Sequence, residues 1–222
     1  KTTSINRNDQ FTEAISASCK NNIPGISLSG YYVLRDNEDE KQAFIDVKNT
    51  LSYLGGNLSV NLPKEYSQAY KEAVAQRTDY NFSIIQSIFS NDYDSALIVS
   101  FITELSNNNI EANSIINIDL MGGAIKKNNN GSFGFRDKNF FLDIQSNWNQ
   151  QIYSQFLENW INSYYKEVLK PENGIYVGFP VTFTNINYSN SQYYNNINYQ
   201  KLKLIKQKYD PENILTYSGT IV

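Results

Sequence analysis

The chain of 222 residues contains no histidine and one cysteine, Cys19. Without histidine it has no Ser-His or Cys-His nucleophile pair, no imidazole metal ligand and no side chain whose ordinary pKa suits a general base near neutral pH. One cysteine excludes an internal disulfide and a cysteine-cluster metal site, and the apolar spacing around Cys19 predicts a small buried hydrophobe. Acid–base chemistry in this chain must therefore use carboxylates, tyrosine or lysine.

Two polar side chains that could take part in chemistry, Asp143 and Gln145, lie two residues apart in a segment whose pattern predicts a strand. Asp143 and Gln145 would share one face of that strand, because side chains alternate across a sheet. Taken by itself, the Asp143 carboxylate is a solvated surface group, and Gln145 is an ordinary surface strand residue.

Hydrophobic periodicity predicts the elements that must position these residues. Strands are predicted over residues 26–34, 80–89, 115–121, 139–145 and 174–179. Helices are predicted over residues 11–19, from 43 to a stop at Gly55 and Gly56, and over 63–76, 92–105, 150–169 and 199–209. Because helices separate strands that lack long apolar runs, we expect an α+β fold, a mostly antiparallel sheet with helices packed on one face.

Charge and hydropathy narrow the classes of partner. The chain has 19 Lys and Arg against 22 Asp and Glu, a net charge of −3, and the basic residues are scattered. This distribution argues against a nucleic-acid partner. No run approaches the roughly 20 apolar residues of a membrane span, so we expect no membrane partner. The sequence begins at Lys1 without methionine, which leaves an upstream segment open and the compartment undetermined.

The stretch from Tyr194 to Leu215 resembles the closing segment of the berberine-bridge-enzyme-like FAD-linked oxidase family. The family pattern runs roughly Tyr-Tyr-Gly-x-Asn-x-x-Arg/Lys-Leu and then Lys-x-x-Tyr-Asp-Pro-x-Asn-x-Phe. The residues that fall in register with it are Asn198, Lys201, Leu202, Lys206, Tyr209, Asp210, Pro211 and Asn213. Further family-like stretches precede it in the family's order, at residues 121–124, 133–145 and 175–180.

Some positions depart from the family pattern. Gly134 and Phe135 stand where the family has Pro-His, Gly178 stands where it has Asn, Asn196 stands where it has Gly, and Asp143 stands where Lys is common in some members. The resemblance covers residues 115–215. Residues 1–114 fit the family's alternation of strands and helices but carry no motif of their own.

The resemblance implies a chemistry and a set of site residues. In the family, hydride passes from a substrate carbon to flavin N5 while a base takes the alcohol or amine proton. By analogy Tyr176 is the catalytic base, the substrate-binding residues are Gln145, Asp143 and Arg136, and the cofactor-binding residues are Asn198 and Tyr194. A free phenol has a pKa of about 10, so Tyr176 requires nearby positive charge or hydrogen bonds to act as a base.

The resemblance also implies a division of the chain. Residues 1–193 would form a substrate-binding α+β domain, and residues 194–222 a C-terminal segment that packs against an FAD-binding domain outside this chain. FAD would be bound mainly by that N-terminal domain, the substrate would be a small molecule, and this chain alone would be inactive.

Two alternatives remain open. The first is a non-catalytic ligand-binding or interaction module on the same scaffold, which a natural start near Lys1 would favour over the oxidase. The second is a carbohydrate-binding protein, suggested by 17 tyrosines and abundant asparagine, since these side chains can stack on and hydrogen-bond sugars. A glycan-binding screen would test the second alternative.

Overall fold

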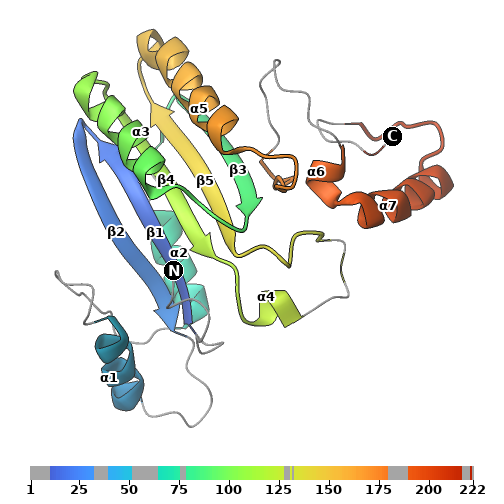
Figure 1. The fold of residues 1–222 in the computed structure, drawn as a ribbon, viewed down its shortest axis with the longest axis horizontal. Coiled ribbons are helices and arrows are strands. Elements are labelled where there is room, and N and C mark those ends of the chain that lie inside the picture. Colours follow the sequence, from blue (N-terminus) through green and yellow to red (C-terminus); the bar gives the residue numbers. More distant parts are fainter. Residues whose placement is uncertain are drawn as a thin grey trace.

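The computed structural model describes residues 11–32, 40–51, 65–75, 79–127, 131, 133–179, 190–216 and 221. Its strands are β1 (Phe11–Lys20), β2 (Ile23–Tyr32), β3 (Phe82–Ser90), β4 (Ala112–Leu120) and β5 (Phe140–Trp148). Its helices are α1 (Glu40–Leu51), α2 (Tyr66–Ala75), α3 (Ser95–Asn107), α4 (Ala124–Lys127), the 3-10 turn η2 (Gln151–Tyr153), α5 (Ser154–Val168), α6 (Asn190–Tyr194) and α7 (Asn196–Tyr209) (Figure 1).

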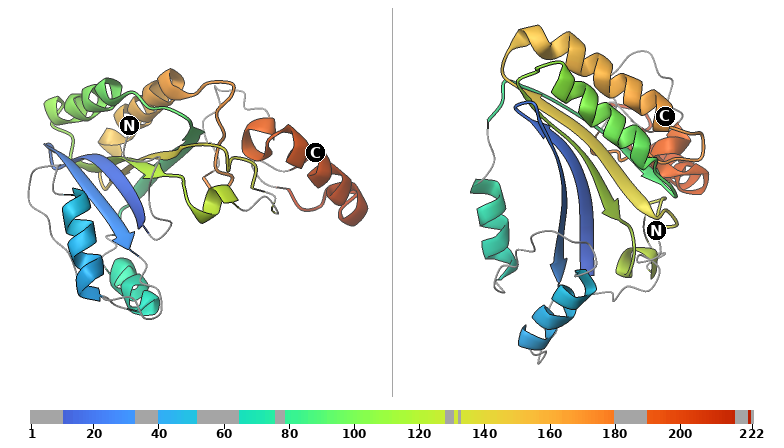
Figure 2. Two further views of the ribbon diagram at one scale, coloured as in Figure 1. Left: turned by 60° about the horizontal axis from the view of Figure 1, so that its bottom comes forward. Right: turned by 60° about the vertical axis from the view of Figure 1, so that its left-hand side comes forward.

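The five described strands form one sheet in the order β2-β1-β4-β5-β3, and every pairing between them is antiparallel. Helices α3 and α5 run side by side over one face of this curved sheet, whereas α1 and α2 lie on its other side (Figure 2). The expected α+β class, a mostly antiparallel sheet with helices packed on it, is confirmed.

The hydrophobic core lies between the sheet and helices α3 and α5. Strand β4 alternates buried and half-buried residues along its length, which places Ile116 and Ile118 on the helix-covered face. Helix α5 contributes Leu157, Trp160 and Ile161 from one stripe. Burying side chains of this size stabilises a fold by about 1.5 to 3 kcal/mol each, so this face of the sheet forms the stable core of the fold.

The predicted helix over residues 11–19 is wrong, because this segment is strand β1. Its period is two: Ala17 and Cys19 are buried among the core residues, while Ser16 and Ser18, which alternate with them, lie on the opposite face. Asn21 and Asn22 then adopt positive φ angles of 49° and 65°. Two positive φ angles in a two-residue loop are typical of the turn that joins the strands of a hairpin, here β1 and β2.

The predicted strand over residues 174–179 is also wrong. Only Gly174 pairs with the sheet, through an isolated bridge to Phe89 whose N···O distances are 2.8 and 3.1 Å. The chain then turns, and the Phe179 amide donates to the Tyr176 carbonyl at 3.0 Å. Over six residues, the sequence pattern of an alternating strand cannot be distinguished from that of a short bridge followed by a turn. Of the predicted helix that was to stop at Gly55 and Gly56, the part after Leu51 lies outside the described residues.

Candidate functional site

The sheet face away from α3 and α5 carries a row of polar side chains. In register across four strands lie Ser16 of β1, Asn117 of β4, Asp143 of β5 and Ser87 of β3. The Ser16 hydroxyl donates to Asn117 Oδ1 at 2.7 Å. The Asn117 amide in turn donates to both carboxylate oxygens of Asp143, at 3.1 and 3.3 Å. We call these four residues the polar row.

Asp143 is buried within this row, with only 8% of its surface exposed. Burial raises the pKa of its carboxyl group, the hydrogen bond from Asn117 opposes that rise, and the charge of Asp119 adds to it, so that the pKa is about 6. Burial also raises the pKa of Asp119, which lies on the same face. Asp143 is therefore not a solvated surface carboxylate, and it can exchange a proton near neutral pH.

Gln145 lies on the same face as Asp143, as strand alternation requires. Its amide donates to Asn147 Oδ1 at 3.1 Å, and the Ser83 hydroxyl donates to the same oxygen at 2.8 Å. The amide oxygen of the half-buried Gln145 side chain is on a face where a substrate hydroxyl or amine could reach it.

Tyr176 is brought to this face by the chain that leaves the bridge at Gly174. Its backbone amide donates to Ser87 Oγ at 3.1 Å, so it is tied to the polar row beside Asp143. Its ring meets Phe141 and Phe89 edge-on, at centroid distances of 6.0 and 6.4 Å.

The Tyr176 side chain is 41% exposed, and among the described residues its hydroxyl has no hydrogen-bond partner. The positive charge or hydrogen bond that a tyrosine base requires must therefore come from outside this part of the chain.

Arg136 is held within the loop that precedes β5. Its Nη1 donates to the Ile125 carbonyl at 3.0 Å, and its guanidinium lies 5.4 Å from the centre of the Phe133 ring. These contacts tie residues 133–137 to α4. Of the predicted substrate-binding residues, the structure brings together Asp143 and Gln145, while Arg136 contacts Phe133 and α4.

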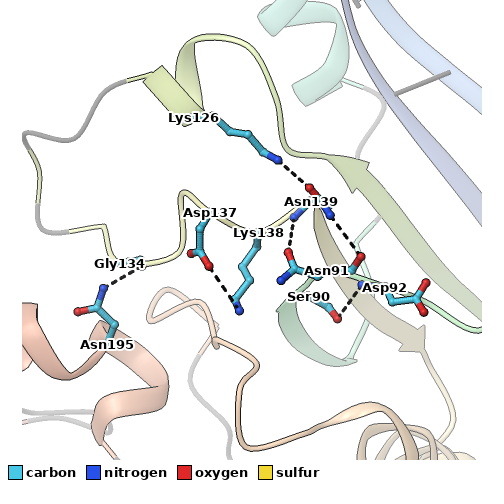
Figure 3. A network of polar contacts seen from close by, with 9 residues as sticks. All are labelled: Ser90, Asn91, Asp92, Lys126, Gly134, Asp137, Lys138, Asn139 and Asn195. Carbon is cyan, nitrogen blue, oxygen red and sulfur yellow. Dashed lines mark hydrogen bonds and ion pairs between the residues drawn. The ribbon is translucent and has the colours of Figure 1, made fainter. Parts of the chain in front are cut away.

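Tyr194 and Asn198 lie at the junction of α6 and α7. Between them Asn195 has a φ of 54° and caps α7, because its Oδ1 accepts the Asn198 amide at 2.9 Å. Its Nδ2 donates to the Gly134 carbonyl at 2.8 Å, which joins the C-terminal helices to the 133–137 loop (Figure 3). The Tyr194 ring stacks on Tyr199 with centroids 6.4 Å apart.

The terminal motif builds a turn after α7. The Asp210 carboxylate pairs with Lys206 and accepts the amides of Ile214 and Leu215 at 2.8 and 3.0 Å. The hydrogen bond from Lys206 is the main cause of the lowered pKa of Asp210. Lys206 also donates to the Leu215 carbonyl at 2.7 Å. These motif residues therefore shape the chain end and take no part in the polar row.

Sequence reasoning missed Asn117, Asp119 and Ser87. The signal was present in β4, where Asn117 and Asp119 alternate with buried Ile116 and Ile118. Ser87 gave no signal, because its role depends on the amide of Tyr176, which is 89 residues away in the chain.

The described part of the chain holds no cluster of three or more His, Cys, Asp or Glu side chains that could bind a metal ion. Within the same residues, none of the helices combines the length and apolar character needed to span a bilayer.

Comparison with known families and solved structures shows which proteins this chain resembles. Residues 176–221 match the family described as "Berberine and berberine like". The resemblance to the berberine-bridge-enzyme-like family is confirmed. This family is one of FAD-linked oxidases, and the berberine-like segment includes Tyr176, Asn198 and the whole of α7. No curated protein sequence matches the chain.

Solved structures share the fold over nearly the whole chain. Berberine bridge enzyme from Eschscholzia californica aligns with a TM-score of 0.73 at 17% identity, over 96% of this chain and 48% of its own. Xylooligosaccharide oxidase from Myceliophthora thermophila C1 gives a TM-score of 0.69 at 17% identity, with coverages of 96% and 48%. A chitooligosaccharide oxidase gives 0.70 at 16% identity, again over 96% and 48%. The chain thus spans about half the length of these structures.

Proposed function

We propose that this chain is the substrate-binding portion of an FAD-dependent oxidoreductase that oxidises an alcohol, sugar or amine by hydride transfer to flavin. The observation that carries the proposal is the sheet face away from α3 and α5, where Asp143 and Gln145 share one side of β5 and the Tyr176 amide is anchored on Ser87, the residue opposite Asp143. The proposal is supported by the berberine-like segment and by the fold shared with a chitooligosaccharide oxidase and with berberine bridge enzyme.

The predicted base and the predicted substrate-binding residues each have a proposed role. Tyr176 takes the proton of the substrate hydroxyl or amine, and Asp143 is the second candidate for this role because its pKa of about 6 suits a base near neutral pH. Gln145 orients the substrate through its amide. Arg136 contributes to substrate binding indirectly, by holding the loop of residues 133–137 in place.

The residues of the C-terminal helices also fit a flavin that is held mostly by another domain. Bound FAD would supply the hydride acceptor, and this chain would contact it through Asn198 and Tyr194. The outer side of α7 is suited to such a neighbour, since its apolar side chains Leu204 and Ile205 are 68% and 53% exposed. We therefore propose that residues 1–193 are the substrate-binding domain and that residues 194–222 pack against an N-terminal FAD-binding domain.

The test uses the full-length protein with its flavin bound. Mixing it under anaerobic conditions with xylobiose, a chitooligosaccharide, a simple secondary alcohol and a secondary amine should bleach the flavin with at least one of these substrates. Tyr176→Phe should slow this reduction by about 100-fold or more, the contribution typical of a general base. An unchanged rate in Tyr176→Phe would contradict the base assignment, and a full-length protein that binds no flavin would contradict the function.

This chain by itself should bind no flavin and turn over no substrate. A purified sample of residues 1–222 with flavin absorbance would overturn that expectation.

The alternative of a non-catalytic ligand-binding or interaction module is favoured by one observation. Gly178 and Gly134 both differ from the family pattern, and a Cβ atom at either would lie within 2.6 Å of a neighbouring atom, so the family's side chains do not fit here without a shift. Ligand binding by a flavin-free full-length protein would support this module.

A further inference from the structure

We propose that Gly178 is the positioning residue for Tyr176, because the absence of a side chain at position 178 lets the phenol ring lie directly over the turn that follows it. This inference deepens the proposed function and rests on it for its catalytic consequence. It concerns where the phenol is held, which can be measured whether or not the protein is an oxidase.

The close approach of the ring to Gly178 is the central observation. A Cβ atom added at Gly178 would lie 2.6 Å from Tyr176 Cε1, 2.9 Å from Cζ and 3.2 Å from the hydroxyl oxygen. Distances under 3.0 Å are not tolerated between unbonded carbon atoms, since optimal contacts are about 3.5 to 4.0 Å. Any residue other than glycine would therefore displace the phenol.

The glycine is needed for this space and not for its backbone conformation. The Phe179 amide donates to the Tyr176 carbonyl at 3.0 Å, which makes Gly178 the third residue of a four-residue turn. Gly178 is not among the residues with positive φ, so its backbone conformation is open to alanine as well. Substitution at this position is thus a steric probe of the ring alone.

Among the described residues, three aromatic rings also contact the Tyr176 ring. Phe141 and Phe89 meet the ring edge-on from the sheet, and Phe179 meets it edge-on with centroids 5.1 Å apart. The backbone amide of Tyr176 is fixed on Ser87 Oγ. Because the ring is partly exposed, an added methyl group can push it aside without opening the core.

The geometry can be tested by fluorine NMR on the full-length protein with fluorotyrosine incorporated at position 176. Gly178→Ala should change the chemical shift of this label while leaving the unfolding midpoint near that of the parent protein. The matched control is Gly25→Ala on β2, where an added Cβ would make only an ordinary contact, 3.7 Å from Ser18 Oγ. An unchanged fluorine signal in Gly178→Ala would overturn the inference.

The catalytic consequence is tested in the same protein by rapid kinetics of flavin reduction. Gly178→Ala should lower kcat by about 100-fold, the cost of misplacing a reacting group by about 1 Å, with little change in KM. In the Tyr176→Phe background the same substitution should have no further effect, because the group that it misplaces is already gone.

These outcomes separate the two proposals. If Gly178→Ala slows the parent and the Tyr176→Phe enzyme equally, Gly178 does not act through Tyr176 and the inference fails. If Tyr176→Phe is itself as fast as the parent, the base assignment fails, and a changed fluorine signal in Gly178→Ala still upholds the positioning of the ring.

Discussion

The side chain of Gln86 is fully buried on β3, and neither its amide oxygen nor its amide nitrogen has a hydrogen-bond partner in the described part of the chain. It pairs across the sheet with Ile144, on the face that the helices cover. A buried polar group without a partner costs about 1 to 3 kcal/mol. Gln86 is thus an unfavourable residue in this layer, unlike the buried Ser114 and Ser146 on the same face, whose hydroxyls are hydrogen-bonded to each other.

Replacing Gln86 with methionine, which has a similar shape, should raise the free energy of unfolding by about 1 to 2 kcal/mol. Urea denaturation of the parent and Gln86→Met proteins measures this difference. A loss of stability would show that the Gln86 amide is hydrogen-bonded in solution, for example to a buried water molecule.

The raised pKa of Asp143 leads to a second prediction. The folded-state pKa is about 6, above the ordinary value of 3.8, so the folded protein binds more protons than the unfolded chain between these values. Stability therefore falls as pH rises through this window and stays lower above it. Asp143→Asn removes the buried charge, and it should raise the free energy of unfolding at neutral pH by up to about 3 kcal/mol.

The measurement is denaturation of Asp143→Asn and parent across about pH 4 to 8. The difference between the two proteins should grow between pH 4 and 6 and then level off. Asp79→Asn is the matched control, because Asp79 is exposed and outside the sheet. A difference that does not depend on pH would contradict the raised pKa.

Among the elements, the C-terminal helices depend on one close contact with the loop before β5. Helix α6 is tied to the chain near the site, where the Ile175 amide donates to the Gln192 carbonyl at 2.7 Å. The junction with α7 meets Gly134, where an added Cβ would lie 2.5 Å from the Tyr194 carbonyl oxygen and 2.6 Å from Asn195 Nδ2. A side chain at position 134 would therefore not fit without a shift of this junction.

Gly134→Ala should therefore separate α6 and α7 from the loop and break the hydrogen bond between Asn195 and Gly134. Hydrogen exchange should become faster in residues 190–209 and stay unchanged in β4 and β5. Gly122→Ala is the control, since an added Cβ at Gly122 meets no atom within 4 Å. Equal exchange in Gly134→Ala and the parent would show that the contact does not hold the helices.

For the whole molecule, the outer side of the C-terminal segment is the surface that the proposed assembly requires. Its exposed apolar residues include Ile197, Leu204, Tyr209 and Ile214, each at least 68% exposed. Helix α7 has no buried residue in this chain alone. Ile197 and Leu204 are seven residues apart and therefore share one side of α7, and an exposed apolar side of a helix is typical of an interface.

Leu204→Asp should weaken assembly with the N-terminal flavin-binding half, because a carboxylate would be buried there without a partner. Flavin content of the co-expressed and purified halves measures this assembly, and it should fall by about 10-fold or more, the effect of losing roughly 1.4 kcal/mol of binding energy. Gln207→Asp, at an exposed polar position of α7, is the control. Equal flavin content in both variants would contradict docking through this side of α7.

The sequence by itself determined the features that depend on local pattern. Helical stripes predicted α3 and α5 close to their observed bounds, alternation predicted β3, β4 and β5, and the terminal motif pointed to the family. These predictions succeeded because periodicity over ten or more residues reflects which face an element buries. The helix prediction for the segment of β1 is wrong because its small residues, such as Ala17 and Ser18, give a weak hydrophobic pattern. The two consecutive asparagines Asn21 and Asn22 are the local signal of the turn that follows.

Only the tertiary structure decided how the site is assembled. The strand register places Asn117 against Asp143, and burial between neighbouring strands changes the proton affinity of that carboxyl group. The position of the Tyr176 ring depends on Ser87, on two phenylalanines of the sheet and on the empty space at Gly178. These are contacts between residues far apart in the chain, which register and packing bring together and which no local pattern encodes.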